Sequence, residues 1–188
     1  MRVLFRFPVF AFMIFYMTPV VAATVASRDD ARQCYLSTLS DLTSADYPQK
    51  LADCDRAIAD QSIDSDLRAG LLVNRSDIEL KMQNFRAALS DADASIALAP
   101  ALATAHLNRG AGLIGLKRYQ EAIDALEKAI VLNKGEKLEI AYFNRGLARD
   151  YLGDLQAAYF DYKKAAEIDP NFGPAQTQLE RFTVTTHR

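Results

Sequence analysis

The sequence predicts an all-α protein built from repeated pairs of helices. An Asn-Arg-small triplet begins at Asn74, Asn108 and Asn144, so it recurs after 34 and then 36 residues. Within each unit the apolar residues follow the spacing of a helix face, as at Ala122, Ile123, Leu126, Ala129 and Ile130. The prolines beyond residue 23 fall only where a helix is expected to start or stop: Pro48, Pro100, Pro170 and Pro174.

Composition narrows the class of protein. The 188 residues include 22 Lys and Arg against 24 Asp and Glu, a net charge of −2. Without a basic excess to neutralise phosphates, a nucleic-acid partner is not expected. A hydrophobic content of 50% with 24% charged residues is typical of a folded globular chain, and the length predicts one domain.

The N-terminus has the pattern of a secretory signal peptide. Arg2 and Arg6 precede the apolar stretch 7–17, Pro19 breaks any helix, and small residues follow up to Ala23. This order predicts a signal peptide over residues 1–23, cleaved after Ala23, and hence an exported chain without a stable membrane anchor. The alternative is an uncleaved anchor, because residues 7–26 are 20 mostly apolar residues.

Each repeated unit divides into two expected helices with small residues in register. Ala88, Ala122 and Ala158 lie twelve residues after the small residue of each triplet, and Ser95, Ala129 and Ala165 follow seven residues later. Short breaks separate the two helices at residues 83–84, 116–117 and 153–154.

These units resemble the tetratricopeptide repeat, a helix–turn–helix of about 34 residues with small residues where the helices touch. The resemblance covers residues 69–102, 103–136 and 139–172, with 137–138 as an insertion. The bulky position before the second helix holds Phe85, Tyr119 and Leu155. Arg replaces the usual apolar residue before the small one in all three units, and the second unit ends in Lys134 instead of Pro. The resemblance implies a tetratricopeptide-type helix–turn–helix solenoid.

The same register places a degenerate repeat at residues 31–64, with helices over about 30–42 and 48–60. In the family, the positions of Cys34 and Cys54 face each other across the helix pair. In an oxidising compartment the resemblance therefore implies a Cys34–Cys54 disulfide. The alternative is two small buried thiols, since helix pairs often hold Cα atoms too far apart for a bridge. Residues 174–182 are predicted to form a capping helix over the last repeat.

The sequence offers little for catalysis, so no enzyme, metal or cofactor is expected. His106 is the only histidine in the repeats, and it takes the place of Leu72 and Tyr142, which predicts a packed core side chain. The acidic pairs are interpreted as solvated faces or loops: Asp53 with Asp55, Asp64 with Asp66, and Asp91 with Asp93.

The resemblance implies a concave groove lined by the first helix of each unit. Carried over to this chain, the groove residues are Val73, Asn74, Asp77, Leu80, Lys81, Thr104, Leu107, Asn108, Ala111, Ile114, Ile140, Phe143, Asn144, Leu147 and Tyr151. The repeated Asn could grip a peptide backbone, or it could form an internal hydrogen bond between neighbouring helices. The repeated Arg is expected to cover the core with its aliphatic stem and to pair with acidic neighbours.

The expected function is that of an exported interaction module, in the periplasm by family resemblance, which binds a protein or peptide partner in this groove. The alternative is a structural subunit of a cell-envelope assembly, joined through its repeat ends. The family subtype that clamps chaperone carboxylates needs Lys and Arg where this chain has Tyr35, Thr104 and Asn144, although Asn74 agrees.

Overall fold

The computed structural model describes residues 29–36, 45–133, 135 and 137–182, and these residues form helices and turns without a strand. Residues 29–36 are helical. The chain then continues through α2 (Tyr47–Ala59), α3 (Ser65–Lys81), α4 (Phe85–Leu98), α5 (Ala103–Gly115), α6 (Tyr119–Leu132), α7 (Leu138–Tyr151), α8 (Leu155–Ile168) and α9 (Gly173–Leu179). The predicted signal peptide lies outside the described residues. Within the described part, no helix has the length and apolarity needed to cross a bilayer.

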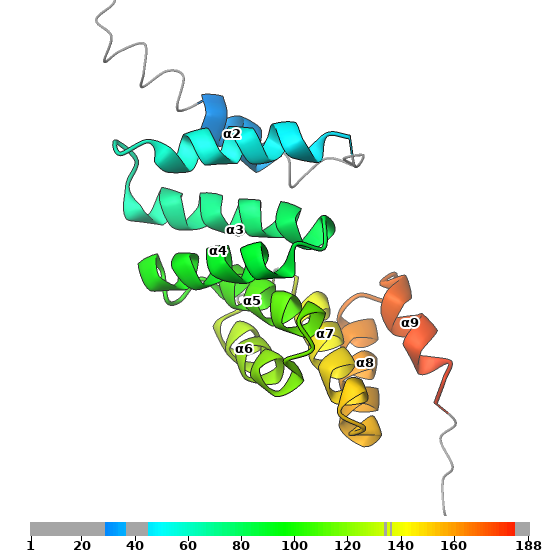
Figure 1. Cartoon of the computed structure of the whole chain (residues 1–188). Coiled ribbons are helices and arrows are strands. Elements are labelled where there is room, and N and C mark those ends of the chain that lie inside the picture. Colours follow the sequence, from blue (N-terminus) through cyan, green and yellow to red (C-terminus); the bar gives the residue numbers. More distant parts are fainter. Residues whose placement is uncertain (1–28, 37–44, 134, 136, 183–188) are drawn as a thin grey trace, which may run out of the picture.

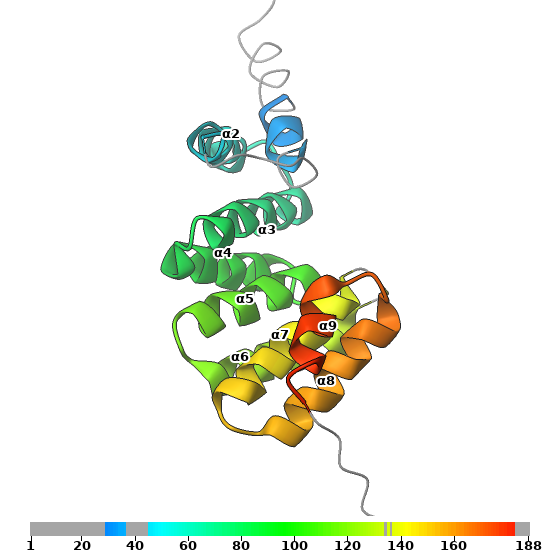
Figure 2. The same cartoon turned by 90° about the vertical axis from the view of Figure 1, so that its right-hand side faces the viewer.

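Consecutive helices pack in pairs, and the pairs stack along the chain. α3 packs on α4, α5 on α6 and α7 on α8, and each pair also contacts the next through α4–α5 and α6–α7. Figures 1 and 2 show the resulting array, in which the helix of residues 29–36 lies beside α2 and the last pair, α7 and α8, runs at a steep angle to α2, α3 and α4. The predicted solenoid of stacked helix pairs is confirmed.

Small residues allow the two helices of a pair to approach closely. A Cβ placed on Gly110 would lie 2.5 Å from Cγ of Leu126, and one on Gly146 would lie 2.9 Å from the ring of Tyr162. In the first full unit this contact is polar, because Ser76 Oγ donates to the carbonyl of Ala88 at 2.9 Å. A larger side chain at these positions would push the helices apart and open the core.

The core follows the stack as two clusters of buried side chains. The larger one joins α5, α6 and α7 through residues such as Leu113, Leu126 and Ala141, all fully buried. The smaller one lies in the N-terminal part and includes Cys34, Cys54 and Ile78. Each unit therefore depends on its neighbours for much of its burial, as expected for a solenoid.

The N-terminal unit is closed by the disulfide that the resemblance implied. Cys34, in the helix over residues 29–36, is bonded to Cys54 of α2, and neither side chain is exposed to solvent. The Cα atoms of the two residues lie 4.8 Å apart, within the range that a bridge requires. The predicted end of the first helix near Leu42 falls outside the described residues.

The C-terminal cap is shorter than predicted. α9 ends at Leu179, whereas the sequence suggested a helix to Phe182. Phe182 nevertheless covers the last repeat, since its ring centroid lies 5.6 Å from that of Tyr159 and 6.2 Å from that of Tyr162. The aromatic contacts, not a longer helix, complete the cap.

The two helices of each full unit are joined by a turn with one residue in the left-handed region. These residues are Gln83 (φ 61°), Lys117 (φ 60°) and Gly153 (φ 84°). Only glycine adopts this conformation without steric cost, because a Cβ crowds the following carbonyl. Two of the three turns are therefore strained.

Lys117→Gly should raise the free energy of unfolding by up to about 1 kcal/mol, because it relieves this strain. Gly153→Ala is the matched control and should lower it by about 1 kcal/mol. Nothing lies within 4 Å of a Cβ built at Gly153, so its effect reports on the backbone alone. Urea unfolding followed by circular dichroism measures both, and effects of the same sign would contradict the strain argument.

Replacing both cysteines by serine should lower the free energy of unfolding by about 3 kcal/mol, as the chain-entropy account gives for a closed loop of this size. The 20-residue separation of Cys34 and Cys54 sets that loop. Chemical denaturation of the oxidised protein and of the Cys34→Ser/Cys54→Ser variant provides the comparison. Reduced wild-type protein is the control and should match the variant. Two titratable thiols in denatured, unreduced protein would show that the bridge does not form.

Candidate functional site

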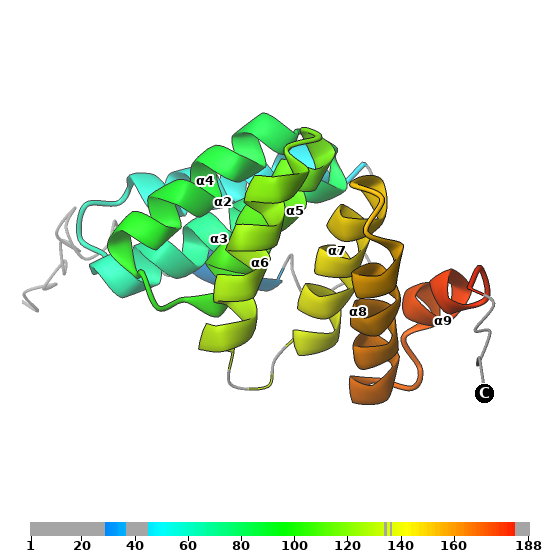
Figure 3. The same cartoon turned by 90° about the horizontal axis from the view of Figure 1, so that it is seen from below.

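The first helices of the units form the inner side of the array. α3 packs on α5 and α5 on α7, whereas the second helices α4, α6 and α8 are spread further apart. Figure 3 shows α5 between α3 and α7. Contact between first helices and separation of second helices give the solenoid a concave first-helix side, as the resemblance implied.

A groove of about 500 Å³ lies on this side, between residues 29–36, α3 and α5. We call it the inner groove; it is lined by Ala31, Tyr35, Asp66, Leu67, Gly70, Leu71, Val73, Asn74, Asp77, Leu102, Thr104, Asn108 and Lys137. The structure thus brings together five of the predicted groove residues: Val73, Asn74, Asp77, Thr104 and Asn108. Leu67 and Gly70 were missed, although their spacing of seven and four residues from Asn74 places them on the same helix face.

The repeated asparagines do not share one role. Asn108 is 7% exposed, and its Nδ2 donates to the carbonyl oxygen of Val73 at 3.1 Å, which links α5 to α3. This is the internal hydrogen bond that the sequence left open as an alternative. Asn74 and Asn144 are half-buried and make no side-chain hydrogen bond to any described residue. Asn74 is therefore the groove asparagine whose amide is available to a partner.

The other predicted groove residues lie outside the inner groove. Lys81 forms an ion pair with Asp77 at 3.0 Å. Phe143 packs against Tyr162 and Phe172, with ring centroids 5.6 Å and 5.4 Å away. Leu107 is buried in the core cluster, and Ile140 and Ile114 pack against it. Leu80, Ala111, Asn144 and Leu147 are half-buried, and Tyr151, which is 60% exposed, stacks on Tyr119.

The repeated arginines bridge successive second helices. Arg75 donates from Nε and Nη2 to Asp91 of its own unit at 2.8 and 2.6 Å, and from Nη1 to Asp55 of the preceding unit. Arg145 bonds Asp161 of its own unit at 2.6 Å and reaches Glu127 of the preceding unit at 3.7 Å. The expected pairing of the arginines with acidic neighbours is confirmed.

These ion pairs also alter the titration of the arginines. Hydrogen bonding to Asp91 raises the pKa of Arg75 above its ordinary value. Burial opposes the charge of Arg145, but hydrogen bonding to Asp161 and the attraction of that carboxylate outweigh it, so its pKa is also raised. Both arginines thus remain charged clamps between neighbouring repeats.

The interpretation of the acidic pairs as solvated was wrong for two residues. Asp91 is 7% exposed and Asp53 is 5% exposed. Asp91 faces Arg75, and Asp53 accepts from Arg56 at 2.6 Å. Their carboxylates are buried because a guanidinium compensates the loss of water, which a sequence pattern of alternating acids does not reveal. Asp64 instead caps α3 by accepting from the amide of Leu67.

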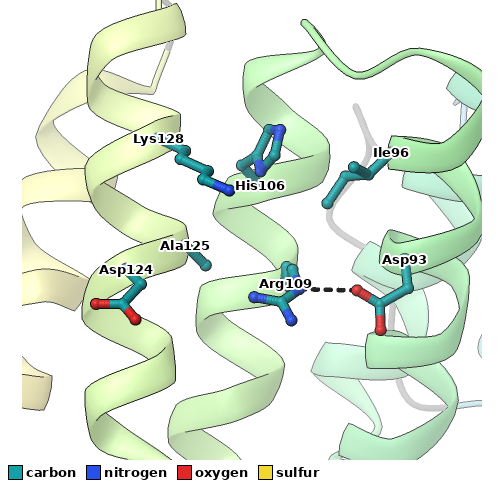
Figure 4. Close-up of a pocket in the computed structure, with 7 residues that line it drawn as sticks. All are labelled: Asp93, Ile96, His106, Arg109, Asp124, Ala125 and Lys128. Atoms are coloured by element: carbon teal, nitrogen blue, oxygen red, sulfur yellow. Dashed lines mark hydrogen bonds and ion pairs between the residues drawn. The ribbon is translucent and has the colours of Figure 1, made fainter.

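Arg109 departs from this pattern. It pairs through Nε with Asp93 of the preceding unit at 2.8 Å and borders a pocket of about 310 Å³ on the second-helix side (Figure 4). We call this the outer pocket; it is lined by Asp93, Ile96, His106, Arg109, Asp124, Ala125 and Lys128. His106 is 6% exposed, and its Nε2 donates to the carbonyl of Pro100 at 2.9 Å, so the packed histidine that the sequence predicted is confirmed.

In the part of the chain that the structure describes, no cluster of His, Cys, Asp or Glu has the arrangement of a metal site. The stacked helix pairs, the arginine–carboxylate ion pairs between them, and recesses on both sides (the inner groove and the outer pocket) are those of a helical repeat protein.

Two segments match family models of the tetratricopeptide repeat: residues 103–136 and 140–172. The second and third full units of the solenoid are therefore tetratricopeptide repeats. Among curated relatives, it is 46% identical over 66 residues to the Arabidopsis thaliana peptidyl-prolyl cis-trans isomerase FKBP42. It is 39% identical over 74 residues to the Xenopus tropicalis RNA polymerase II-associated protein 3. These matches cover 35% and 39% of this chain, but only 18% and 11% of the relatives' own lengths.

Solved structures show the same fold. The tetratricopeptide domain of Arabidopsis OM64 aligns with a TM-score of 0.59 at 24% identity, covering 63% of this chain and 96% of that domain. The first such domain of Spaghetti (RPAP3), solved with the HSP90 peptide SRMEEVD bound, aligns with a TM-score of 0.57 at 25% identity. That match covers 65% of this chain and 94% of the domain.

Proposed function

We propose that this protein is an interaction module that holds a peptide segment of a protein partner in the inner groove. The observation that carries the proposal is the groove itself, which combines apolar walls from Leu67, Leu71 and Val73 with the polar side chains of Asn74 and Thr104. Apolar anchors surrounded by polar contacts are what a peptide-binding surface needs. No catalytic step is part of the proposal, since the tetratricopeptide fold is typically a binding scaffold.

The relatives support this function. The RPAP3 domain was solved with an HSP90 peptide, and a second RPAP3 domain, 25% identical to this chain, with the HSP70 peptide SGPTIEEVD. Both peptides are acidic at their C-terminus. An acidic peptide would be bound by cationic side chains, but the inner groove of this chain carries Asp66 and Asp77, with Lys137 as its one lining cation among the described residues. We therefore infer that its partner is not bound through a carboxylate clamp, but through backbone contacts and apolar side chains.

Replacing Leu67 by Ser together with Asn74 by Ala should weaken partner binding about tenfold or more, because an apolar anchor and an amide contact are both lost. Leu67 is 44% exposed and Asn74 is half-buried, so the fold should tolerate both changes. Cross-linking capture from native extract identifies the partner, and titration calorimetry with that partner measures the loss. Phe143 is unsuitable for this test because its ring packs against Tyr162 and Phe172.

A second candidate function is favoured by exposed apolar side chains in the last repeat. Leu152, Leu155 and Phe160, at the α7–α8 turn and on α8, are 51%, 52% and 57% exposed. Exposed apolar side chains suit a structural subunit that joins its assembly through its last repeat. Leu155→Ser/Phe160→Ser is thus the control for the groove variant. Partner capture that survives the groove changes and is lost with the changes at Leu155 and Phe160 would favour this second function.

We further propose that the chain is exported, most simply to a periplasm, after removal of residues 1–23. Two features support this: the basic, apolar and small-residue order of the N-terminus, and a buried disulfide, which persists in oxidising compartments. Intact-mass analysis of the protein from its native cells should find a chain that begins at Thr24. A full-length chain recovered from the membrane fraction would instead support the uncleaved anchor.

A further inference from the structure

The second repeat lacks one half of the arginine clamp that its sister repeats share. In the first and third units, the residue sixteen positions after the repeated arginine is a buried aspartate, Asp91 or Asp161, which binds that arginine. The corresponding residue in the second unit is Ala125. The preceding-unit carboxylate is still present, since Asp93 of α4 binds Arg109 as Glu127 of α6 binds Arg145.

The guanidinium of Arg109 is consequently left with a single carboxylate. Among the residues that the structure describes, its only hydrogen bond joins Nε to Asp93, and its two terminal nitrogens bind no carboxylate. Arg75 and Arg145, by contrast, each engage their own aspartate through two nitrogens. A guanidinium presents a planar fork that suits a carboxylate held by two hydrogen bonds, so the vacant side of Arg109 is an acceptor-binding position.

The outer pocket occupies the place of the missing aspartate. Figure 4 shows Arg109 reaching into it from α5, Lys128 reaching toward it from α6, and Ala125 presenting only a methyl group. Lys128 forms no ion pair with any described residue. The carboxylate of Asp124 points away from Arg109 in this view and accepts from Gln120 at 3.4 Å.

Other carboxylates near the outer pocket are already bound by arginines. Arg118 binds Glu121 at 2.6 Å, and Arg149 contacts Glu127 at 3.4 Å. Neither acid forms a hydrogen bond with Arg109, although the hydrogen bond from Arg118, together with the charge of Arg109, lowers the pKa of Glu121. The outer pocket is lined by two carboxylates, Asp93 and Asp124, as well as by Arg109 and Lys128. Asp93 binds only Nε of Arg109, so the two terminal nitrogens of Arg109 and the ammonium of Lys128 are the groups that an entering carboxylate could bind.

A recess of about 780 Å³ adjoins the outer pocket and shares Ile96, His106, Asp124 and Lys128 with it. Its further lining is Pro100, Glu127, Val131 and Leu132, and Val131 is 83% exposed. Ile96, Pro100, Val131 and Leu132 give this recess an apolar part, which could take an apolar neighbour of an acidic residue along the same peptide.

We propose that the outer pocket is a second docking site, which accepts the side-chain carboxylate of an acidic residue from a protein partner, with an apolar residue of that partner in the adjoining recess. The carboxylate binds Arg109 where Asp91 and Asp161 bind the arginines of the sister repeats, and Lys128 approaches it from α6. This site lies on α4, α5 and α6, away from the lining of the inner groove between residues 29–36, α3 and α5, and it does not depend on the function proposed for that groove.

The test uses a short peptide with a central Glu-Val pair, acetylated and amidated so that its only carboxylate is the glutamate side chain. Nitrogen-15 NMR of the protein should show the Arg109 Nε signal shifting on titration. The same peptide with Gln in place of Glu should bind at least about tenfold more weakly, which is the loss of affinity expected for a charge-assisted hydrogen bond. Equal shifts with both peptides would overturn the proposal, as would binding only by a peptide with an uncapped C-terminus.

Ala125→Asp supplies a carboxylate from within the chain and should abolish peptide binding while raising the melting temperature. The sister repeats hold a buried aspartate at this position, so the variant is expected to fold, and circular dichroism checks it. Arg109→Gln and Lys128→Gln remove the cations without filling the pocket and should each weaken binding. Lys164→Gln, at the position equivalent to Lys128 in the third repeat, is the matched control and should bind as wild type. Unchanged binding by Arg109→Gln would refute the site.

Discussion

Close approach of paired helices at small residues is the constraint on which the rest of this structure depends. Gly110 and Gly146 leave room for Leu126 and Tyr162. At the equivalent position of the first full unit, Ser76 donates a hydrogen bond to the backbone carbonyl of the facing helix. One pair of helices cannot bury its apolar surface alone, so each pair must stack on its neighbours to form a core. Stacking in turn places first helices against first helices, which creates the inner groove, and separates second helices, which leaves the outer pocket between α4 and α6.

The helical fold could be predicted because its determinants are local and repeat in register. The small residues at Ala88, Ala122 and Ala158 and the breaks near residues 83, 117 and 153 mark helix contacts and turns directly in the sequence. The family register also placed Cys34 opposite Cys54, where the structure has a disulfide. The helix at the C-terminus was predicted too long, since the packing of Phe182 on Tyr159 and Tyr162 does not require a helix up to that residue.

The sites were harder to predict because they depend on distances between elements. The family register treats all units alike, yet the inner groove gathers residues from α3 and α5, while Phe143 of α7 packs on Tyr162 and Phe172. Tyr35 and Ala31 come from the degenerate unit; the family register placed Tyr35 at a clamp position, but neither residue was among the predicted groove residues. The burial of Asp91 likewise follows from the reach of Arg75 across two helices. The sequence analysis did not single out Ala125, because its meaning emerges only when the three arginines are compared in space.

The disulfide links the chemical surroundings of the protein to the geometry of the inner groove. Cys34 lies between Ala31 and Tyr35 in sequence, and both of those residues line the inner groove. The helix that carries them is tied to α2 by a covalent bond that a reducing cytoplasm does not sustain. Without this bond, the helix would be held to α2 by non-covalent contacts alone, such as the ion pair of Asp30 with Arg56 at 2.9 Å. Under the proposed groove function, capture of a partner should therefore depend on the oxidation state of these two cysteines.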